Sequence, residues 1–527
     1  MTSGEPDPPA DGAGGEASLS RRELQDRAIK GSMWTVIHTL VSIPLAFIVN
    51  VIIARVLGVV DYGRLAYLST VMGVVGGIAE LGIGTGLVQF GAKAHAVGRT
   101  EEVRRLLSAT QGFRLLVVAP IISVVVISIA RVDLGLLVIA VIFGVLLPAA
   151  LGGAPACLTI ENKTAAGAQI AMAINVLAQI AVVVTIVTIG TADAIWAVRL
   201  IIGGGAIALA LFFVAPEYRR AVLRPSSPWR LGREFWRFAI PAGAAGLIGG
   251  LVVSRTEVLL LTWMSQPAAA GLFALAFALA GHIFAPAQAL IGPLVPAISG
   301  LREVDEEAVH RALSRTLRAA ATVVALLVSA ALPAFAALVP LIYGQQYDEA
   351  RVLMIALGIA GGFLVISGPI QAFVQARLLG TRILWVNLTA LVVDVVLAVT
   401  LIPPLGVWGA VIANVAGSVT QLGILLAGEV KALGVRWVDA GQDLLPTGVG
   451  AAGCLGSWAI AAAVGIPPVP TSLVAGALGL GFVVLGLRWT RSGLAAGDAE
   501  AILRSMPARL AQVTRPLLAA CSFRSAV

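Results

Sequence analysis

The chain alternates between long apolar stretches and short polar connections along almost its whole length. A helix needs about 20 apolar residues to cross the hydrocarbon core of a bilayer. Breaks that carry proline, glycine or charge separate the stretches, so the pattern predicts fourteen membrane-spanning helices. The predicted spans are 33–54, 66–92, 112–130, 134–157, 166–190, 193–215, 238–264, 268–298, 317–342, 350–375, 383–402, 405–430, 443–465 and 469–488.

The composition supports this pattern and excludes other classes of protein. Hydrophobic residues make up 58% of the 527 residues and charged residues only 12%, whereas soluble domains carry about 25% charged residues. The apolar runs are continuous rather than alternating, which disfavours a β-barrel. Cys157, Cys454 and Cys521 lie far apart, so we expect neither a disulfide framework nor a metal site. The predicted fold class is therefore an all-α polytopic membrane protein.

The net charge of +8 records orientation rather than nucleic-acid binding. When the N-terminus is placed in the cytoplasm, 30 of the 36 basic residues fall in cytoplasmic segments and only four on the opposite side. Basic residues concentrate in the cytoplasmic loops of membrane proteins. We therefore expect both termini in the cytoplasm and no nucleic-acid partner.

An internal repeat is indicated by two alignments with nearly the same offset. A shift of about 210 residues covers six spans, which preserves orientation, so the repeat predicts two six-helix lobes related by a parallel pseudo-twofold axis, followed by a helix pair. The matched pairs are Gly63 with Gly271, Ala66 with Ala274, Asn175 with Asn387 and Trp196 with Trp408.

The predicted organisation has six parts. The linker between the lobes combines arginine with tryptophan and phenylalanine, which predicts an amphipathic helix lying at the membrane interface. A short amphipathic helix is expected near 498–506 in the tail. The parts are a disordered leader 1–30, an N-terminal lobe 31–215, the linker 216–237, a C-terminal lobe 238–432, the terminal pair 433–489 and a cytoplasmic tail 490–527.

Five loop and helix-end sequences occur in an order that carries a family resemblance. They are IIARVLGVVDYGRLAYL (52–68), SRTEVLLLTWMSQPAAAGLFALAF (254–277), PLVPAISGLREVDEE (293–307), LVPLIYGQQYDEARVLM (338–354) and LIPPLGVWGAVIAN (401–414). The ordered set, over about residues 28–490, resembles the lipid-linked oligosaccharide flippases of polysaccharide biosynthesis, in the multidrug/oligosaccharidyl-lipid/polysaccharide exporter superfamily.

The resemblance implies a central cavity lined by spans 1, 2, 7 and 8 and an alternating-access mechanism in a bacterial cytoplasmic membrane. The implied substrate is a polyprenyl-diphosphate-linked oligosaccharide, and the implied partners are membrane lipids and polysaccharide-assembly proteins. Coupling to H⁺ or Na⁺ is implied in place of ATP, and none of the four lysines follows a glycine as a P-loop requires. No cofactor or enzymatic activity is expected. A lipid II flippase and a multidrug antiporter are the alternatives, and a membrane-embedded polymerase is the least favoured.

Ionisable residues inside spans are costly, so each requires an explanation. Arg255 and Arg199 are candidates for binding the anionic head group, because a guanidinium matches phosphate oxygens. The alternatives are a structural ion pair for Arg255 and a snorkelling side chain for Arg199.

Four other titratable residues are candidates for ion coupling or for charge partners of these arginines. They are Glu80, Glu257, Asp394 and His282. The related flippases commonly have Asp where this chain has Glu257.

Uncharged polar residues in the spans are interpreted as interhelical hydrogen-bonding groups, or alternatively as sugar contacts in the cavity. These residues are Asn50, Gln371, Gln375 and Asn414.

Overall fold

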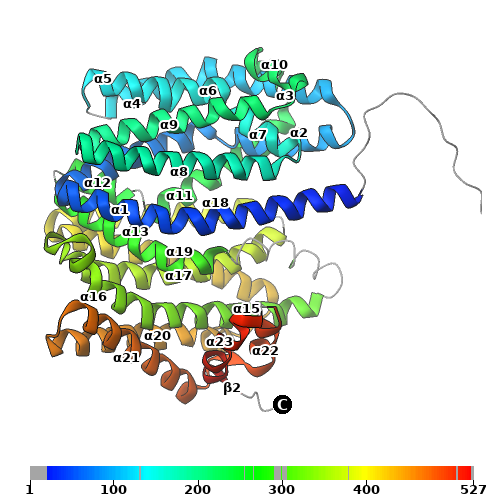
Figure 1. Cartoon of the computed structure of the whole chain (residues 1–527). Helices are drawn as coiled ribbons and strands as arrows, with labels where there is room; N and C mark the ends of the chain where they lie inside the picture. Colours follow the sequence, from blue (N-terminus) through cyan, green and yellow to red (C-terminus); the bar gives the residue numbers. More distant parts are fainter. Residues whose placement is uncertain are drawn as a thin grey trace, which may run out of the picture.

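The computed structural model describes residues 21–523, apart from 130–131, 255, 265, 290–297, 299–305, 378 and 506–507. Long helices run side by side through this part of the chain (Figure 1). The strands it contains are β1 (Leu494–Ala495) and β2 (Ser522–Phe523), which pair in parallel in the tail. The predicted all-α membrane fold is confirmed.

The first half begins with a long helix that is interrupted at a glycine. Gly58 has non-helical dihedrals (φ 73°, ψ 178°), so α1 turns back there and its two parts form separate crossings. The helices are α1 (Arg21–Glu80), α2 (Ile83–Ala96), α3 (Thr100–Phe113), α4 (Ala119–Ile129), α5 (Leu134–Ile139), α6 (Leu147–Leu151), α7 (Gly153–Ile160), α8 (Thr164–Thr188) and α9 (Ala192–Phe213), with π-helical turns η1 (Arg114–Val118) and η2 (Ala140–Leu146).

The linker is not the single amphipathic helix that the sequence predicts. It consists of α10 (Pro216–Leu223) and the 3₁₀ turn η3 (Pro228–Arg230). Proline residues begin both pieces, and the proline ring fixes φ at a helical value while lacking the N–H that a continuing helix would need. At the other end, α1 starts at Arg21, inside the predicted leader, of which residues 1–20 lie outside the described part.

The second half and the tail continue the pattern. Their helices are α11 (Arg233–Ser254), α12 (Thr256–Trp263), α13 (Pro267–Ala289), α15 (Glu306–Leu326), α16 (Leu332–Tyr343), α17 (Ala350–Ala376), α18 (Gly380–Leu405), α19 (Val407–Leu433), α20 (Trp437–Val464), α21 (Pro468–Thr490), α22 (Ala496–Ser505) and α23 (Ala508–Ala520), with a π-helical turn η4 (Leu327–Ala331) and a 3₁₀ turn η5 (Gln345–Tyr347).

Twelve helices in the described residues are long and apolar enough to cross a membrane. The first, Ile37–Glu80, has 44 residues, or about 66 Å at 1.5 Å per residue, which is twice the hydrocarbon thickness of about 30 Å. Its bend at Gly58 makes it two crossings. Together α11 and α12 cover the predicted span 238–264, so the helices accommodate the fourteen predicted spans except at residues 130, 255 and 290–297, which lie outside the described part.

The two halves meet through the glycine pair that defined the predicted repeat. A Cβ on Gly63 would lie 2.2 Å from the Pro267 carbonyl oxygen, and a Cβ on Gly271 would lie 2.1 Å from the Val59 carbonyl oxygen. Residues 59 and 63 therefore meet 267 and 271 reciprocally at the offset of 208, as related surfaces do across a twofold axis. The other proposed match is weaker, because Trp196 is buried while Trp408 is exposed.

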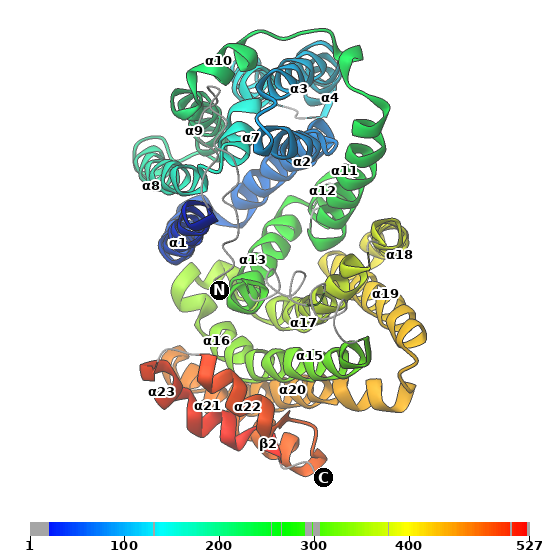
Figure 2. The ribbon, with the colours of Figure 1, turned by 90° about the vertical axis from the view of Figure 1, so that its right-hand side faces the viewer.

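Further contacts between the halves occur at the same end of the molecule. The Arg55 Nε donates to the Ile342 carbonyl at 2.5 Å, and the Tyr347 hydroxyl donates to the Ala54 carbonyl at 3.0 Å. Viewed along the helices, α1 and α13 lie between the helices of the two halves (Figure 2). The halves are therefore joined firmly at the end that contains the α1 bend.

The terminal helices α20 and α21 pack against α15 and α16. The buried carboxylate of Asp443 accepts hydrogen bonds from Arg318 at 2.6 and 2.9 Å and from Ser314 at 2.5 Å. The Ser329 hydroxyl donates to the Gly479 carbonyl at 2.7 Å. The terminal pair is thus attached to the second half rather than to the first.

Candidate functional site

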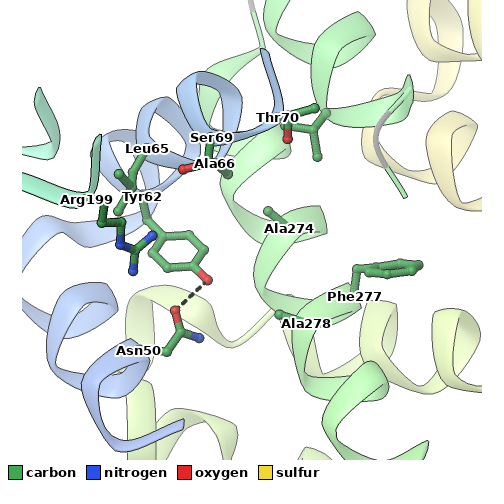
Figure 3. A pocket seen from close by; sticks show the side chains of 11 residues that line it. Asn50, Tyr62, Leu65, Ala66, Ser69, Thr70, Arg199, Ala274, Phe277 and Ala278 are labelled. Carbon is green, nitrogen blue, oxygen red and sulfur yellow. Dashed lines mark hydrogen bonds between the residues drawn. The ribbon is translucent and has the colours of Figure 1, made fainter. Parts of the chain in front are cut away.

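A cavity of about 280 Å³ lies between the two halves, beside the second part of α1 (Figure 3). Side chains from α1 and α9 form one wall, and α12 and α13 form the other. Its lining residues are Asn50, Tyr62, Leu65, Ala66, Ser69, Thr70, Arg199, Val258, Ala274, Phe277 and Ala278.

Arg199 is the charged group of this cavity. Its side chain is exposed to the cavity and lies beside the Tyr62 ring, and no carboxylate pairs with it among the described residues. The Tyr62 hydroxyl donates to Asn50 Oδ1 at 3.0 Å. An unpaired guanidinium surrounded by hydroxyl and amide groups can bind an anion with polar substituents, since its fork-shaped donors match phosphate oxygens.

The sequence singled out Arg199 and Asn50 but not their neighbours. Tyr62 lies in a segment predicted to be a loop, and Ser69 and Thr70 are uncharged, so their presence in a span carries no cost that would mark them as unusual. Tyr62 and Ser69 are seven residues apart, which places them on one helical face. This seven-residue spacing is the sequence feature from which a shared polar face could have been predicted.

Two acidic residues meet in the second half, and no basic side chain among the described residues pairs with either of them. Glu257 is fully buried on α12, and its Oε1 accepts a hydrogen bond from Asn414 Nδ2 at 2.6 Å. Asp394 on α18 is also buried, and its carboxyl lies within hydrogen-bonding range of Glu257 when one of the two groups carries a proton. The structure therefore brings together two candidates that are 137 positions apart in the sequence.

The groups around this pair fit a hard cation or a shared proton. Asn387 and Gln421 lie next along the same helices and bond to each other at 2.8 Å. Oxygen ligands are those that hard cations prefer. Several buried oxygens here have no hydrogen-bond partner among the described residues: Glu257 Oε2, both Asp394 carboxylate oxygens, Asn414 Oδ1, Ser418 Oγ and Gln421 Oε1.

Glu80 has a partner that the sequence did not indicate. Arg114, which is one of the 30 basic residues that the charge count places on the cytoplasmic side, is buried and donates to Glu80 Oε2 at 2.8 Å. The Glu80 Oε1 accepts from the Gly84 amide at 2.5 Å, across a break at Leu81 and Gly82, both of which have positive φ. Glu80 also lines a second cavity between the halves, of about 330 Å³.

The remaining candidates lie elsewhere. His282 Nδ1 is 2.5 Å from the Ala278 carbonyl oxygen, and its ring meets Phe47 edge-on. Gln371 and Gln375 are on α17, where no side-chain hydrogen bond involves them among the described residues. Arg255 lies outside the described residues.

Known proteins share this sequence pattern and fold. The profile of a family described as "polysaccharide biosynthesis protein" matches residues 28–302. The structure is similar to the lipid II flippase MurJ in an inward closed conformation, with a TM-score of 0.62 and 13% identity over 86% of this chain and 99% of that chain. No curated protein sequence matches the chain.

Two transporters of the MATE type share the fold as well. One is an inward-facing multidrug resistance transporter of the MOP superfamily, with a TM-score of 0.56 and 18% identity over 74% of this chain and 96% of that chain. The other is the eukaryotic transporter AtDTX14, with a TM-score of 0.52 and 14% identity over 80% and 99%. Since the family profile covers more than half of the sequence, the chain belongs to the polysaccharide biosynthesis protein family.

Proposed function

We propose that this protein is a flippase that moves a polyprenyl-diphosphate-linked oligosaccharide from the inner to the outer leaflet of a bacterial cytoplasmic membrane, for cell-surface polysaccharide synthesis. The observation that carries the proposal is Arg199 in the cavity between the halves, since no carboxylate of the described residues pairs with it. A diphosphate must lose water to cross the membrane, and a guanidinium in a low-dielectric cavity offsets that loss. The Asn50, Ser69 and Thr70 side chains offer hydrogen bonds to sugar hydroxyls.

A reconstituted assay tests the role of Arg199. Vesicles containing the protein and a fluorescent polyprenyl-diphosphate oligosaccharide report flipping as loss of protection from an external quencher. We expect Arg199→Gln to lower the initial rate at least tenfold, and Arg199→Lys to restore only part of it because the fork is lost. Arg64→Gln is the matched control, since Arg64 lies outside the cavity and is bound to Asp193 at 2.7 Å.

Two results would sink the proposal. One is a wild-type rate for a folded Arg199→Gln protein. The other is equal flipping of lipids that lack the diphosphate. Lipid II serves as a parallel substrate, because the flippase MurJ shares this fold, and faster transport of lipid II would favour the peptidoglycan-precursor alternative.

Ion coupling is proposed to occur at Glu257 and Asp394. Their carboxyl groups have no cationic partner among the described residues, and unpartnered oxygens surround them. Glu257→Gln and Asp394→Asn should abolish stimulation of flipping by an imposed Na⁺ or proton gradient. If both variants respond to the gradient as the wild type does, the coupling ion binds elsewhere.

We also propose that both termini lie in the cytoplasm and that the helix ends lie at the two membrane interfaces. Exposed tryptophans are typical of membrane interfaces. Trp385, Trp437 and Trp489 lie near helix ends on the predicted cytoplasmic side, and Trp263 and Trp408 lie near helix ends on the other. A C-terminal fusion to a protein that fluoresces only in the cytoplasm tests this orientation. Labelling of the C-terminal tail in intact cells by a membrane-impermeant reagent would contradict it.

A further inference from the structure

A basic groove lies between α3 and the linker, outside the cavities described above. Its volume is about 700 Å³, and five arginines line it: Arg104, Arg105, Arg220, Arg224 and Arg230. Glu101 and Glu217 are the acidic residues in the lining. The groove therefore carries a surplus of three positive charges.

Most of these arginines are available to a ligand. Arg104 is occupied, because it pairs with Glu101 and its Nε donates to the Glu217 carbonyl at 3.0 Å. Arg105, Arg220 and Arg224, and likewise Arg230, form no ion pair or side-chain hydrogen bond among the residues that the structure describes. Four guanidinium groups thus line one hollow, and the Glu217 carboxylate is the one acidic group in that lining that Arg104 does not pair with.

Backbone contacts hold the linker in place and so preform the groove. The Ser226 amide donates to the Ser108 carbonyl at 2.9 Å, and the two hydroxyls lie 3.1 Å apart. A Cβ on Gly112 would lie 1.8 Å from the Ser226 carbonyl oxygen, so only glycine permits this approach of the linker to α3.

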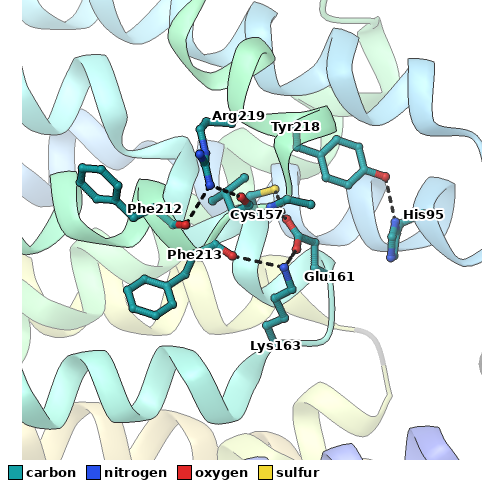
Figure 4. A network of polar contacts seen from close by, with 10 residues as sticks. His95, Cys157, Glu161, Lys163, Phe212, Phe213, Tyr218 and Arg219 are labelled. Atoms are coloured by element: carbon teal, nitrogen blue, oxygen red, sulfur yellow. Dashed lines mark hydrogen bonds and ion pairs between the residues drawn. The ribbon is translucent and has the colours of Figure 1, made fainter.

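The other face of α10 is fixed by the first half (Figure 4). The Tyr218 hydroxyl lies 2.9 Å from His95 Nδ1, and Arg219 Nη2 donates to the Phe212 and Val214 carbonyls at 2.8 and 3.1 Å. Burial raises the pKa of Tyr218 to about 12, so the phenol keeps its proton at physiological pH. With this face anchored, Arg220 and Arg224 are held toward the groove.

The length of the helix that carries α3 indicates that the groove lies at the depth of the lipid head groups. Helix Thr100–Ile129 has 30 residues, or about 45 Å, and the hydrocarbon core accounts for about 30 Å of that length. The first ten residues, which include the groove residues of α3, therefore extend into the head-group layer. Next to Arg230, Trp229 is 89% exposed, as expected of an aromatic side chain inserted at the interface.

We propose that this groove binds the phosphate head group of an anionic phospholipid. Phosphodiesters match the guanidinium fork, basic residues near a membrane surface attract anionic lipids, and the exposed Trp229 gives the acyl region an apolar contact. This inference does not depend on the transported substrate. Because the bound lipid would contact both α3 and the linker, it would also strengthen the attachment of the linker to the first half.

Native mass spectrometry of the purified full-length protein tests the proposal. Phosphatidylglycerol and phosphatidylcholine are titrated separately, and inorganic diphosphate is added in a third arm. We expect the triple variant Arg105→Gln, Arg220→Gln, Arg224→Gln to bind phosphatidylglycerol at least tenfold more weakly, with phosphatidylcholine unchanged. The control replaces three exposed arginines outside the groove, Arg233, Arg237 and Arg491, with glutamine and should retain wild-type affinity.

Several outcomes would overturn the inference. Wild-type phosphatidylglycerol affinity in the groove variant would show that the groove is not the binding site. An equal loss of affinity in the control would show that the effect comes from the lower net charge rather than from the groove. Occupancy by diphosphate at concentrations that leave phosphatidylglycerol unbound would assign the groove to a soluble anion. If the triple variant unfolds, Arg224→Gln alone should still weaken phosphatidylglycerol binding about threefold.

Discussion

The reciprocal contact of Gly63 and Gly271 offers the sharpest test of how the two halves close. In Gly63→Ala, the new methyl group would lie 2.2 Å from the Pro267 carbonyl oxygen and 2.8 Å from the Gly271 amide nitrogen. Carbon and oxygen atoms in contact stand more than 3 Å apart, so the halves must separate by about 1 Å. Backbone atoms form the obstacle, which leaves no flexible side chain to move aside.

The energetic consequence follows from the cost of overpacking. Extra methyl groups in well-packed interiors cost about 1–3 kcal/mol, and this range corresponds to roughly 5- to 150-fold in an equilibrium between two states. If alternating access requires this end to close, Gly63→Ala should shift the population by that factor toward the open state. Flipping should slow as well, because the closed state becomes rare.

Spin labels at both sides of the contact measure this shift. Val60 and Leu405 are exposed near this end on the two halves, while Cys157, Cys454 and Cys521 are all buried. We expect Gly63→Ala to move the distance distribution between labels at 60 and 405 toward longer distances. Gly76→Ala is the matched control, because Gly76 lies on the same helix as Gly63 and a Cβ there would meet nothing within 4 Å.

The reasoning fails if Gly63→Ala leaves the distance distribution unchanged, or if Gly76→Ala widens it equally. Gly271→Ala should reproduce the effect of Gly63→Ala, because a Cβ there would lie 2.1 Å from the Val59 carbonyl oxygen. The double variant should cost less than the sum of the single variants, since the first substitution has already separated the two surfaces. Additive shifts would indicate that the two glycines act at independent contacts.

Thermal unfolding in detergent tests three further predictions. Glu80→Gln should lower the unfolding midpoint more than Arg114→Gln, because it leaves the Arg114 charge, which is 8% exposed, without its partner, whereas Arg114→Gln leaves the Glu80 carboxylate, which is 45% exposed. A larger loss in Arg114→Gln would contradict this reasoning. Arg318→Gln should likewise lower the midpoint more than Asp443→Asn, because it leaves the Asp443 carboxylate, which is 1% exposed, without its cation. Equal losses in the two variants would indicate an effect of packing rather than of charge. Asn414→Leu should cost about 1–3 kcal/mol by leaving a buried carboxylate oxygen unpaired, and a neutral result would mean that this bond contributes little.

The sequence predicted the helices well because crossing a membrane is a local requirement on about 20 consecutive residues. It failed where a residue's environment depends on a distant segment. Arg114 stands two residues inside a predicted span and is counted with the cytoplasmic loops, yet it is buried and pairs with Glu80, which lies 34 positions earlier. Hydropathy cannot reveal such a pairing, since it does not specify which helices are neighbours.

In the candidate site, too, the sequence identified individual residues but not the contacts between them. Glu257 and Asp394 were each singled out as unusual charges in apolar spans, and Asn414 was interpreted as an interhelical hydrogen-bonding group. The bond from Asn414 to Glu257 confirms that interpretation. Their meeting depends on the packing of α12, α18 and α19, which follows from three separate helix faces rather than from any one segment.

The geometry of α12 links the two proposed sites physically. Val258 lines the cavity that contains Arg199, and the preceding residue, Glu257, points into the carboxyl pair with Asp394. A shift of α12 on neutralisation of that pair would therefore change the wall of the cavity directly, without a long chain of contacts. Since coupling between two sites is reciprocal, filling the cavity around Arg199 would in turn change the affinity of the carboxyl pair for its cation. The adjacent positions of Glu257 and Val258 on one short helix are thus sufficient to couple ion and substrate in the proposed cycle.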